Sequence, residues 1–289
     1  ENRLEIKKMT KKFFKNFISI TTKISGECCN KMQNLLHLCN MSGILNHLTL
    51  LKENQESELV VLIDPDKSEQ KAIHRLVEGC LQSQISTLLI GGSYVPQGKT
   101  EQLLKWIKEV STELSLVLFP GHPDQISSQA DALLLLSLLS GRNPDYLIGH
   151  HVQSANRLRD SGLDLIPTAY ILIDGGKTTA VQYISNTQPI PPQEIALACS
   201  TALAGEQLGM KLVYMDAGSG ALLPIPIELI EEVSKTTALP LVVGGGMRTP
   251  RELQDRAIAG AQWLVVGNAL EKDPNLLKEM ALAIPQRTR

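Results

Sequence analysis

Short apolar runs recur along the chain from about residue 58, and segments with helical spacing of their apolar positions separate most of them. The runs are rich in Val, Ile and Leu and do not alternate with polar residues, which is typical of parallel strands covered on both faces. Eight such strands are predicted, at Leu59–Ile63, Thr87–Ile90, Leu116–Phe119, Ala132–Leu136, Leu165–Ile173, Lys211–Met215, Leu239–Val243 and Trp263–Val266.

The segments between these runs carry helix-start signals. Ser68–Glu69 and Thr100–Glu101 begin the first two predicted helices, and Pro226 and Pro250 stand near the starts of later ones. Eight βα units in residues 41–289 match the usual length of a (β/α)8 barrel, roughly 250 residues. We therefore predict an α/β protein with one TIM-barrel domain. An open, doubly wound sheet is the alternative, but its usual nucleotide fingerprint after the first strand is missing.

The third and fourth units are weaker than the others. Residues 120–130 are too few for a long helix, and residues 143–151 have the composition of a loop. We expect an irregular barrel here, and an apolar trench that opens at this point. Tyr146 and Tyr170 are candidates to line it.

Residues 1–40 differ from the rest of the chain in charge. They hold eight Lys and Arg and three acidic residues, net +5, whereas the whole chain has a net charge of −2. We expect this segment to be an appendage, disordered or outside the fold, with Met41 opening the barrel domain. A basic amphipathic helix at residues 11–20 that touches a membrane surface is the alternative. The acidic main body argues against nucleic-acid binding.

Two further features bear on location. The longest apolar run, residues 132–139, is far shorter than the roughly 20 residues that span a bilayer, so no transmembrane segment is expected. The five cysteines are an odd number and lack metal-ligand spacing, which favours reduced thiols in a cytoplasmic protein.

Chemistry in a barrel of this kind gathers where strands end, at the C-terminal rim. The segment YMDAGSGA, residues 214–221, follows the sixth strand and offers the carboxylate of Asp216, small residues and the hydroxyl of Ser219. A glycine-rich turn at a strand end exposes backbone N–H groups that hold phosphate, and the carboxylate accepts hydrogen bonds from a polyol. The segment therefore predicts a site for a sugar-alcohol phosphate.

The loops after the last two strands strengthen the phosphate prediction. Gly245 and Gly246 follow the seventh strand, and Gly267 and Asn268 follow the eighth. Glycines let a backbone approach phosphate closely, and Asn268 can begin a short helix whose N–H groups face the anion. Arg248 suits either the phosphate or a salt bridge at the rim.

The end of the first strand predicts a cation site. Asp64 and Asp66 flank a proline there, and Ser93 follows the second strand. Mg²⁺ takes oxygen ligands, commonly one or two carboxylates plus substrate phosphate. We predict Mg²⁺ at Asp64, with Ser93 binding directly or through water. A helix-capping role is the alternative, stronger for Asp66 than for Asp64, and Lys67 either neutralises a second phosphate or is solvated.

Other polar residues give weaker signals. His122, His150 and His151 lack the spacing of zinc ligands, so we expect loop-packing or solvated roles. Lys177 is left without a role.

The motifs together resemble a known family. DPDK, GGS, FPG, YILIDGGKTT, YMDAGSGA, VGGGMR and VVGN occur in the order and spacing of the geranylgeranylglyceryl phosphate synthase family, which includes bacterial heptaprenylglyceryl phosphate synthases. The resemblance covers residues 59–276. It is to the group found in archaea and Bacteroidetes-type bacteria. A shorter bacterial branch commonly has Lys two residues before the first Asp, where this chain has Leu62.

The resemblance implies a prenyltransferase of ether-lipid biosynthesis. It would join the C3 hydroxyl of sn-glycerol 1-phosphate to C1 of a prenyl diphosphate, geranylgeranyl in the first instance, and release diphosphate. It implies Mg²⁺ at Asp64 and Ser93 and a homo-oligomer. Glycerol phosphate would be held by Tyr214, Met215, Asp216, Ala217, Gly218, Ser219, Gly220, Gly245, Gly246, Gly267 and Asn268. Many members carry Glu where this chain has Asp216, whose side chain is shorter. The hydroxyl proton would go either to Asp216 or to the leaving diphosphate.

Two other functions stay open at this point. A phosphosugar isomerase or synthase of the phosphate-barrel type would need an acid–base pair across the mouth, and Asp64 and Asp216 are both acids. A non-catalytic binder of a phosphate ligand would not need Asp64 at all.

Overall fold

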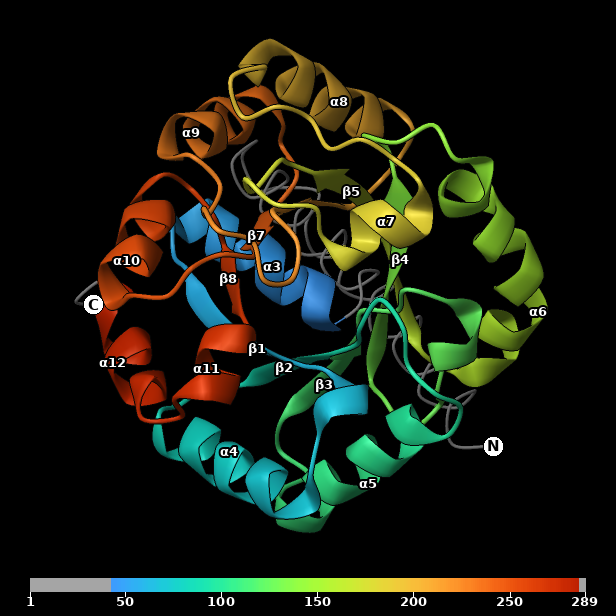
Figure 1. The fold of residues 1–289 in the computed structure, drawn as a ribbon, viewed down its shortest axis with the longest axis vertical. Helices are drawn as coiled ribbons and strands as arrows, with labels where there is room; N and C mark the ends of the chain where they lie inside the picture. Colours follow the sequence, from blue (N-terminus) through green and yellow to red (C-terminus); the bar gives the residue numbers. More distant parts are fainter. Residues whose placement is uncertain (1–42, 286–289) are drawn as a thin grey trace, which may run out of the picture. The chain divides into compact units, whose positions relative to one another are not determined.

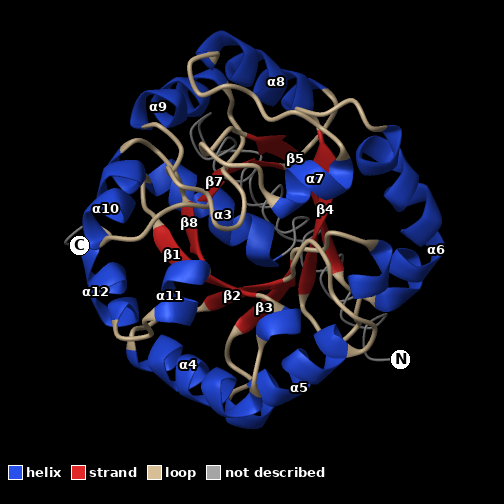
Figure 2. Ribbon diagram, viewed as in Figure 1, coloured by secondary structure: helices blue, strands red, loops and turns tan. Residues whose placement is uncertain are grey.

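The computed structural model describes residues 43–285. Eight parallel strands close into a barrel in sequence order, and β1 pairs with β8 from Glu58↔Trp263 to Val61↔Val266. Helices form a ring outside the strands (Figure 2). The TIM-barrel prediction is therefore confirmed. The expectations for residues 1–40 lie outside the described residues.

The strands are close to the predicted runs. Their bounds are β1 Glu58–Ile63, β2 Thr87–Ile90, β3 Ser115–Leu118, β4 Ala132–Leu138, β5 Asp164–Leu172, β6 Leu212–Asp216, β7 Leu241–Gly244 and β8 Trp263–Val266. Alternate residues of each strand face opposite sides. In β1, Leu59, Val61 and Ile63 belong to the core between strands and helices, whereas Leu62 faces the barrel interior.

The outer helices follow most strands in turn (Figure 1). They are α4 Gln70–Gln82, α5 Lys99–Val110, α6 His150–Ser161, α7 Ala180–Ser185, α8 Ile195–Gln207, α9 Ile227–Thr236, α10 Pro250–Ile258, α11 Asn268–Lys272 and α12 Leu276–Ala283. Thr249 and Glu252 form a reciprocal capping box at the start of α10, next to the predicted Pro250.

The N-terminal end of the barrel is covered by α3, Gly43–Asn54, which is seen through the ring of strands in Figure 1. Lys52 Nζ donates to the carbonyls of Thr237 and Leu239 just before β7, and His47 Nε2 lies 2.8 Å from Glu58 Oε1 at the start of β1. Because α3 occupies this end, the open end of the barrel is the one where the strands finish.

The third and fourth units depart from the regular repeat in different ways. Only a 3-10 turn, Pro123–Gln125, lies between β3 and β4, as the short spacing predicted. The prediction of a loop over residues 143–151 is wrong, because a π-helical segment at Asp145–Gly149 runs directly into α6. Its mixed composition reflects a helix with one face toward a cavity and one toward solvent. Segments of π-helix are frequent near functional sites.

Candidate functional site

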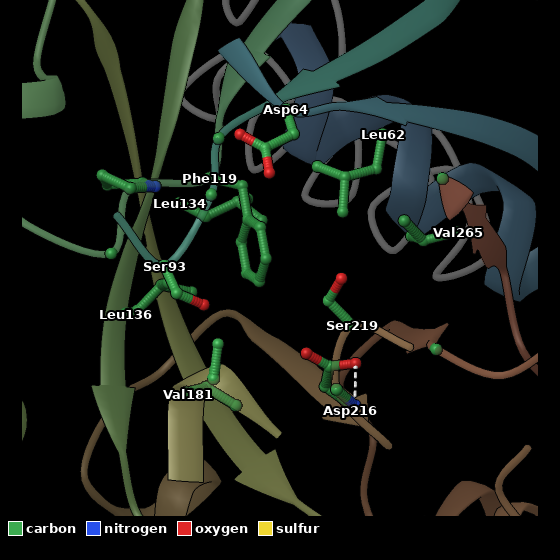
Figure 3. Close-up of a pocket in the computed structure, with 18 of the residues that line it drawn as sticks. Leu62, Asp64, Ser93, Phe119, Leu134, Leu136, Val181, Asp216, Ser219 and Val265 are labelled. Atoms are coloured by element: carbon green, nitrogen blue, oxygen red, sulfur yellow. Dashed lines mark hydrogen bonds between the residues drawn. The ribbon is translucent and has the colours of Figure 1, made fainter. Parts of the chain in front are cut away.

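A cavity of about 580 Å³ opens at the C-terminal end of the barrel. Its size is in the range of small-molecule sites. Loops after β1, β2, β3, β6, β7 and β8 line it, together with parts of β4, α6, α7 and α11. Figure 3 shows Asp64 on one side of this space and Asp216 and Ser219 on the other. The predicted cation site and the predicted phosphate loops thus share one opening.

Asp64 directly follows β1, and its carboxylate lies in the cavity. Its Oδ1 accepts a hydrogen bond from the backbone N–H of Asp66 at 3.1 Å, so Asp64, and not Asp66, caps the short turn Pro65–Lys67. Its Oδ2 lies 2.9 Å from Lys67 Nζ. The hydrogen bond and the charge of Asp64 raise the pKa of Lys67, against the opposing effect of burial. The capping alternative, which the sequence favoured for Asp66, therefore holds for Asp64, and Asp64 combines this role with a place in the site.

Gly92 is needed beside this carboxylate, because a β-carbon there would lie 2.6 Å from Asp64 Oδ1. Ser93 is the next residue and also lines the cavity (Figure 3). The described residues contain no cluster of three His, Cys, Asp or Glu side chains. The carboxylate of Asp64 and the hydroxyl of Ser93 are a donor set that fits Mg²⁺, because this ion takes few protein carboxylates and completes its shell with water and substrate phosphate. The ammonium of Lys67 already stands beside Asp64 as a cation.

Glu271 of α11 adds a second acid to this corner. Burial raises its pKa, the ammonium of Lys67 opposes the rise, and the negative charge of Asp64 adds to it. Glu271 lines the cavity, as does Lys272. Sequence analysis missed both residues because no motif surrounds them.

Asp216 ends β6 and is 7% exposed. Tyr170 donates a hydrogen bond to its Oδ2 at 2.6 Å, and the backbone N–H of Gly218 donates to Oδ1 at 2.7 Å. Burial raises the pKa of Asp216, while these two hydrogen bonds stabilise the ionised form and lower it. Asp216 is thus a fixed, weakly solvated acceptor that faces the cavity.

An aromatic cluster supports Asp216. The ring of Phe119 stacks on that of Tyr214 at 4.9 Å between centroids, and Tyr170 meets both rings edge-on. Gly244 leaves room for the Tyr214 hydroxyl, which would lie 2.6 Å from a β-carbon at that position. Tyr214 and Tyr170 therefore line the cavity through rings that hold one another in place.

The glycine loops after β6, β7 and β8 come together as predicted. Gly218 and Gly245 have φ angles of 86° and 82°, which favour glycine. A β-carbon at Gly245 would lie 2.9 Å from both Asp216 Oδ1 and the Gly218 nitrogen. Ser219 Oγ donates to Asn268 Oδ1 at 3.1 Å, which joins the first and last loops. We call the loops with Gly218–Gly220, Gly245–Gly246 and Gly267–Asn268 the anion cradle.

Three predicted residues have other surroundings. Met215 and Ala217 are buried in the core and do not line the cavity, because they alternate with Tyr214 and Asp216 along the chain. Arg248 lines the cavity, but its guanidinium donates to the carbonyls of Leu222 and Ala221 and so holds the loop after β6. No ion pair of Arg248 occurs within residues 43–285.

The other half of the cavity is apolar and lies at the third and fourth units, where the sequence predicted a trench. Leu134 and Leu136 of β4, Val181 of α7 and Leu62 surround it (Figure 3). The predicted Tyr146 and Tyr170 line it too. The inward residues of β4 look identical in sequence to its outward ones, so only their place in the barrel separates them.

The three histidines lie at this apolar half. The rings of His122 and His150 meet edge-on at 5.3 Å, and Tyr146 packs on His150 at 4.7 Å. His151 Nε2 lies 3.0 Å from Ser137 Oγ. Burial lowers the pKa of His150 and His151, which favours neutral rings. Their packing role matches the expectation, and they belong to the cavity wall.

Comparisons with known proteins agree with this geometry. The PcrB family profile matches residues 51–284. The chain is 48% identical over 224 residues to the geranylgeranylglyceryl phosphate synthase of Chitinophaga pinensis, covering 78% of this chain and 88% of that protein. It is 39% identical over 217 residues to the protein of the same name from Pyrococcus abyssi, covering 75% and 85%.

Solved structures give the same result. A crystal structure of (S)-3-O-geranylgeranylglyceryl phosphate synthase from Thermoplasma acidophilum, in complex with its substrate sn-glycerol-1-phosphate, superposes with a TM-score of 0.78 at 30% identity, covering 84% of this chain and 98% of that one. Tryptophan synthase from M. tuberculosis, at 14% identity and a TM-score of 0.53, shares the fold alone. By sequence, fold and the matched length, the chain belongs to the PcrB family.

Proposed function

We propose that this protein is a prenyltransferase that joins sn-glycerol 1-phosphate to a prenyl diphosphate, with geranylgeranyl diphosphate as the first candidate. The oxygen of the C3 hydroxyl forms a bond to C1 of the prenyl chain, and the bond between C1 and the diphosphate oxygen breaks. The hydroxyl proton goes to Asp216 or to the departing diphosphate. The product is an ether of glycerol phosphate.

The observation that carries this proposal is the arrangement of one cavity with two unlike halves. The loops of the anion cradle provide N–H donors for a phosphate. Asp216, positioned by the N–H of Gly218, provides an acceptor for a polyol hydroxyl. Leu134, Leu136 and Val181 provide a wall for a long hydrocarbon chain, whose burial is worth nominally ~0.8 kcal/mol per CH₂. The site therefore holds both substrates with their reacting ends toward its centre, and such positioning lowers the entropic barrier.

We further propose that Mg²⁺ binds at Asp64, with an oxygen from Ser93 directly or through water. When bound, this ion neutralises charge that grows on the departing diphosphate. Asp64 is the carboxylate that would hold it, and Lys67 lies close enough to contribute a further positive charge to the same corner.

The apolar half favours this function over a phosphosugar isomerase or synthase. A small phosphosugar is polar and would not make use of an apolar wall of leucines and aromatic rings. A non-catalytic binder would not require Asp64 to face the cavity, and Asp64 does face it (Figure 3).

The surroundings of the site are part of the same proposal. Tyr94, Tyr183 and Leu223 sit in segments that follow the strand ends and are 64–81% exposed, which favours a transient contact of the mouth with a membrane surface. No helix in residues 43–285 has the length and apolar character that crossing a membrane takes.

Cys80 and Cys199 are free thiols, as is usual in the cytoplasm. Exposed leucines on α8, such as Leu197 and Leu203, suit a homo-oligomer.

One assay tests the reaction. Purified protein is incubated with sn-glycerol 1-phosphate, labelled geranylgeranyl diphosphate and Mg²⁺, and butanol-extractable ether is measured. We expect product that depends on both substrates and falls when the divalent ion is chelated. Absence of product with prenyl diphosphates of every tested length contradicts the proposal.

A further inference from the structure

The anion cradle is built mainly from neutral donors. Its three loops offer backbone N–H groups, the hydroxyl of Ser219 and the amide of Asn268. Helix α11, which follows the last loop, has only five residues and adds little dipole. A phosphate monoester carries up to two negative charges at neutral pH, so a cation beside such a cradle strengthens binding.

Most basic side chains around the cavity are already engaged. Lys67 is paired with Asp64. Arg248 donates both of its terminal nitrogens to the carbonyls of Ala221 and Leu222. The charge of Lys272 lowers the pKa of Glu271. Lys67 and Arg248 cannot meet a phosphate in the cradle without losing these contacts, whereas Lys272 has only its charge interaction with Glu271.

Lys177 differs from them. Its Nζ and the Asn268 Nδ2 each lie 3.9 Å from the point that a β-carbon on Gly220 would occupy. Lys177, on the loop after β5, therefore brings its ammonium close to the first cradle loop. Its side chain is exposed and makes no hydrogen bond or ion pair within the described part of the chain.

The loop that carries Lys177 is fixed to the cradle. The carbonyl of Gly175 accepts N–H groups from Leu222 at 2.9 Å and Leu223 at 3.0 Å, and both follow the first cradle loop. Gly176 N–H donates to the carboxylate of Asp174 at 2.9 Å, which turns the loop. These contacts fix the backbone from which the Lys177 side chain extends toward Gly220.

Thr179 gives an independent indication that this loop serves the cradle. It precedes α7 but does not cap it, and its Oγ1 is buried without a hydrogen-bond partner. A β-carbon at Gly218 would lie 2.6 Å from the Thr179 methyl and 2.8 Å from this Oγ1, so the side chain of Thr179 packs directly against the cradle glycine. A buried hydroxyl without a partner is costly unless it serves a function.

We infer that Lys177 is a binding residue for the phosphate of glycerol phosphate, and that the loop 174–179 forms the fourth wall of the anion cradle. This inference rests on the proposed function for the identity of the ligand. Lys177 acts as a point charge on the phosphate oxygens, while the glycine loops supply directional N–H donors. It adds affinity for the phosphorylated substrate and has no part in binding the prenyl chain.

The test is a binding titration with the full chain. We expect Lys177→Met to weaken the binding of sn-glycerol 1-phosphate and of inorganic phosphate by about tenfold each, the scale of one charge-assisted contact. The affinities of Lys177→Arg should stay within about threefold of the parent values. Lys211→Met is the matched control, since Lys211 is an exposed lysine just before β6, at the other end of the barrel, and its loss leaves both affinities unchanged.

The outcomes separate this inference from the proposed function. If the parent protein binds glycerol phosphate and Lys177→Met binds it equally well, the inference is overturned and the prenyltransferase proposal stands. Loss of glycerol phosphate binding with unchanged phosphate binding also overturns it, because the charge then acts elsewhere on the ligand. If the parent binds neither ligand, the proposed function itself fails.

Discussion

The two halves of the cavity are built in different ways. The polar half consists of loops after β1, β6, β7 and β8, in which glycines allow close contacts and a few acids have fixed partners. The apolar half consists of side chains on regular elements, chiefly β4, α6 and α7. Loops can place small polar groups at defined positions, whereas strands and helices provide a continuous apolar wall. The difference suits one charged substrate and one with a long apolar chain.

The halves also differ in how they treat charge. In the polar half, Asp216 is buried yet held ready to accept hydrogen bonds by Tyr170 and Gly218. In the apolar half, burial lowers the pKa of His150 and His151 and favours neutral rings beside the leucines. If this division reflects function, a substitution in one half should affect one substrate and spare the other.

The largest effect is expected at Asp64. Asp64→Asn keeps the acceptor for the Asp66 N–H but loses the charge, so we expect turnover to fall about a hundredfold or more. Affinity for glycerol phosphate, measured by titration, should stay near the parent value. Asp66→Asn is the control, because the exposed Asp66 side chain makes no hydrogen bond within residues 43–285. Equal loss of turnover and glycerol phosphate affinity at Asp64 contradicts the metal assignment.

A charge in the apolar half should act on the other substrate. Val181→Asp places a carboxylate against the proposed prenyl chain, and we expect the KM for prenyl diphosphate to rise about tenfold or more, because an unpaired charge resists burial. Glycerol phosphate affinity should not change. Val152→Asp, on the solvent side of α6 where Val152 is 71% exposed, provides the control. A larger effect on glycerol phosphate than on prenyl diphosphate would break the division into halves.

A smaller effect is expected at Lys67, whose ammonium lies at Asp64 where we propose the metal binds. Lys67→Met removes this competing cation, and exposed ion pairs are worth about 0.2–1 kcal/mol, so Mg²⁺ should bind about two- to fivefold more tightly to the substrate-free protein. Calorimetry without substrates measures this directly, with the exposed Lys71→Met as control. Weaker Mg²⁺ binding in Lys67→Met means that Lys67 does not compete for Asp64.

The smallest expected change is in pH dependence. Tyr170→Phe removes a hydrogen bond that lowers the pKa of Asp216, so this pKa rises further. The ionised carboxylate is the form that accepts a hydrogen bond from the substrate hydroxyl. The acid limb of the activity profile should therefore shift to higher pH in the variant, and activity should approach the parent value in alkaline solution. Profiles of kcat/KM against pH test this, with Tyr146→Phe as control. An acid limb that does not move shows that Asp216 does not titrate in this reaction.

The sequence determined the barrel, the polar half and the residues that face each other there. Non-alternating strands, their number and the glycines and acids at their ends are local features, and parallel strands bring such ends to one rim. Asp64, Ser93, Asp216 and the cradle glycines were therefore identifiable from the order of residues alone.

Only the tertiary structure decided the rest. Val61 and Leu62 are neighbours with similar chemistry, but Leu62 faces the cavity and Val61 packs against the helices, because both faces of a barrel strand are covered. Lys177 and Gly220 are far apart in sequence and meet only when the loops after β5 and β6 pack together. Periodicity records which residues avoid water, and the closure of the barrel decides which of them line its mouth.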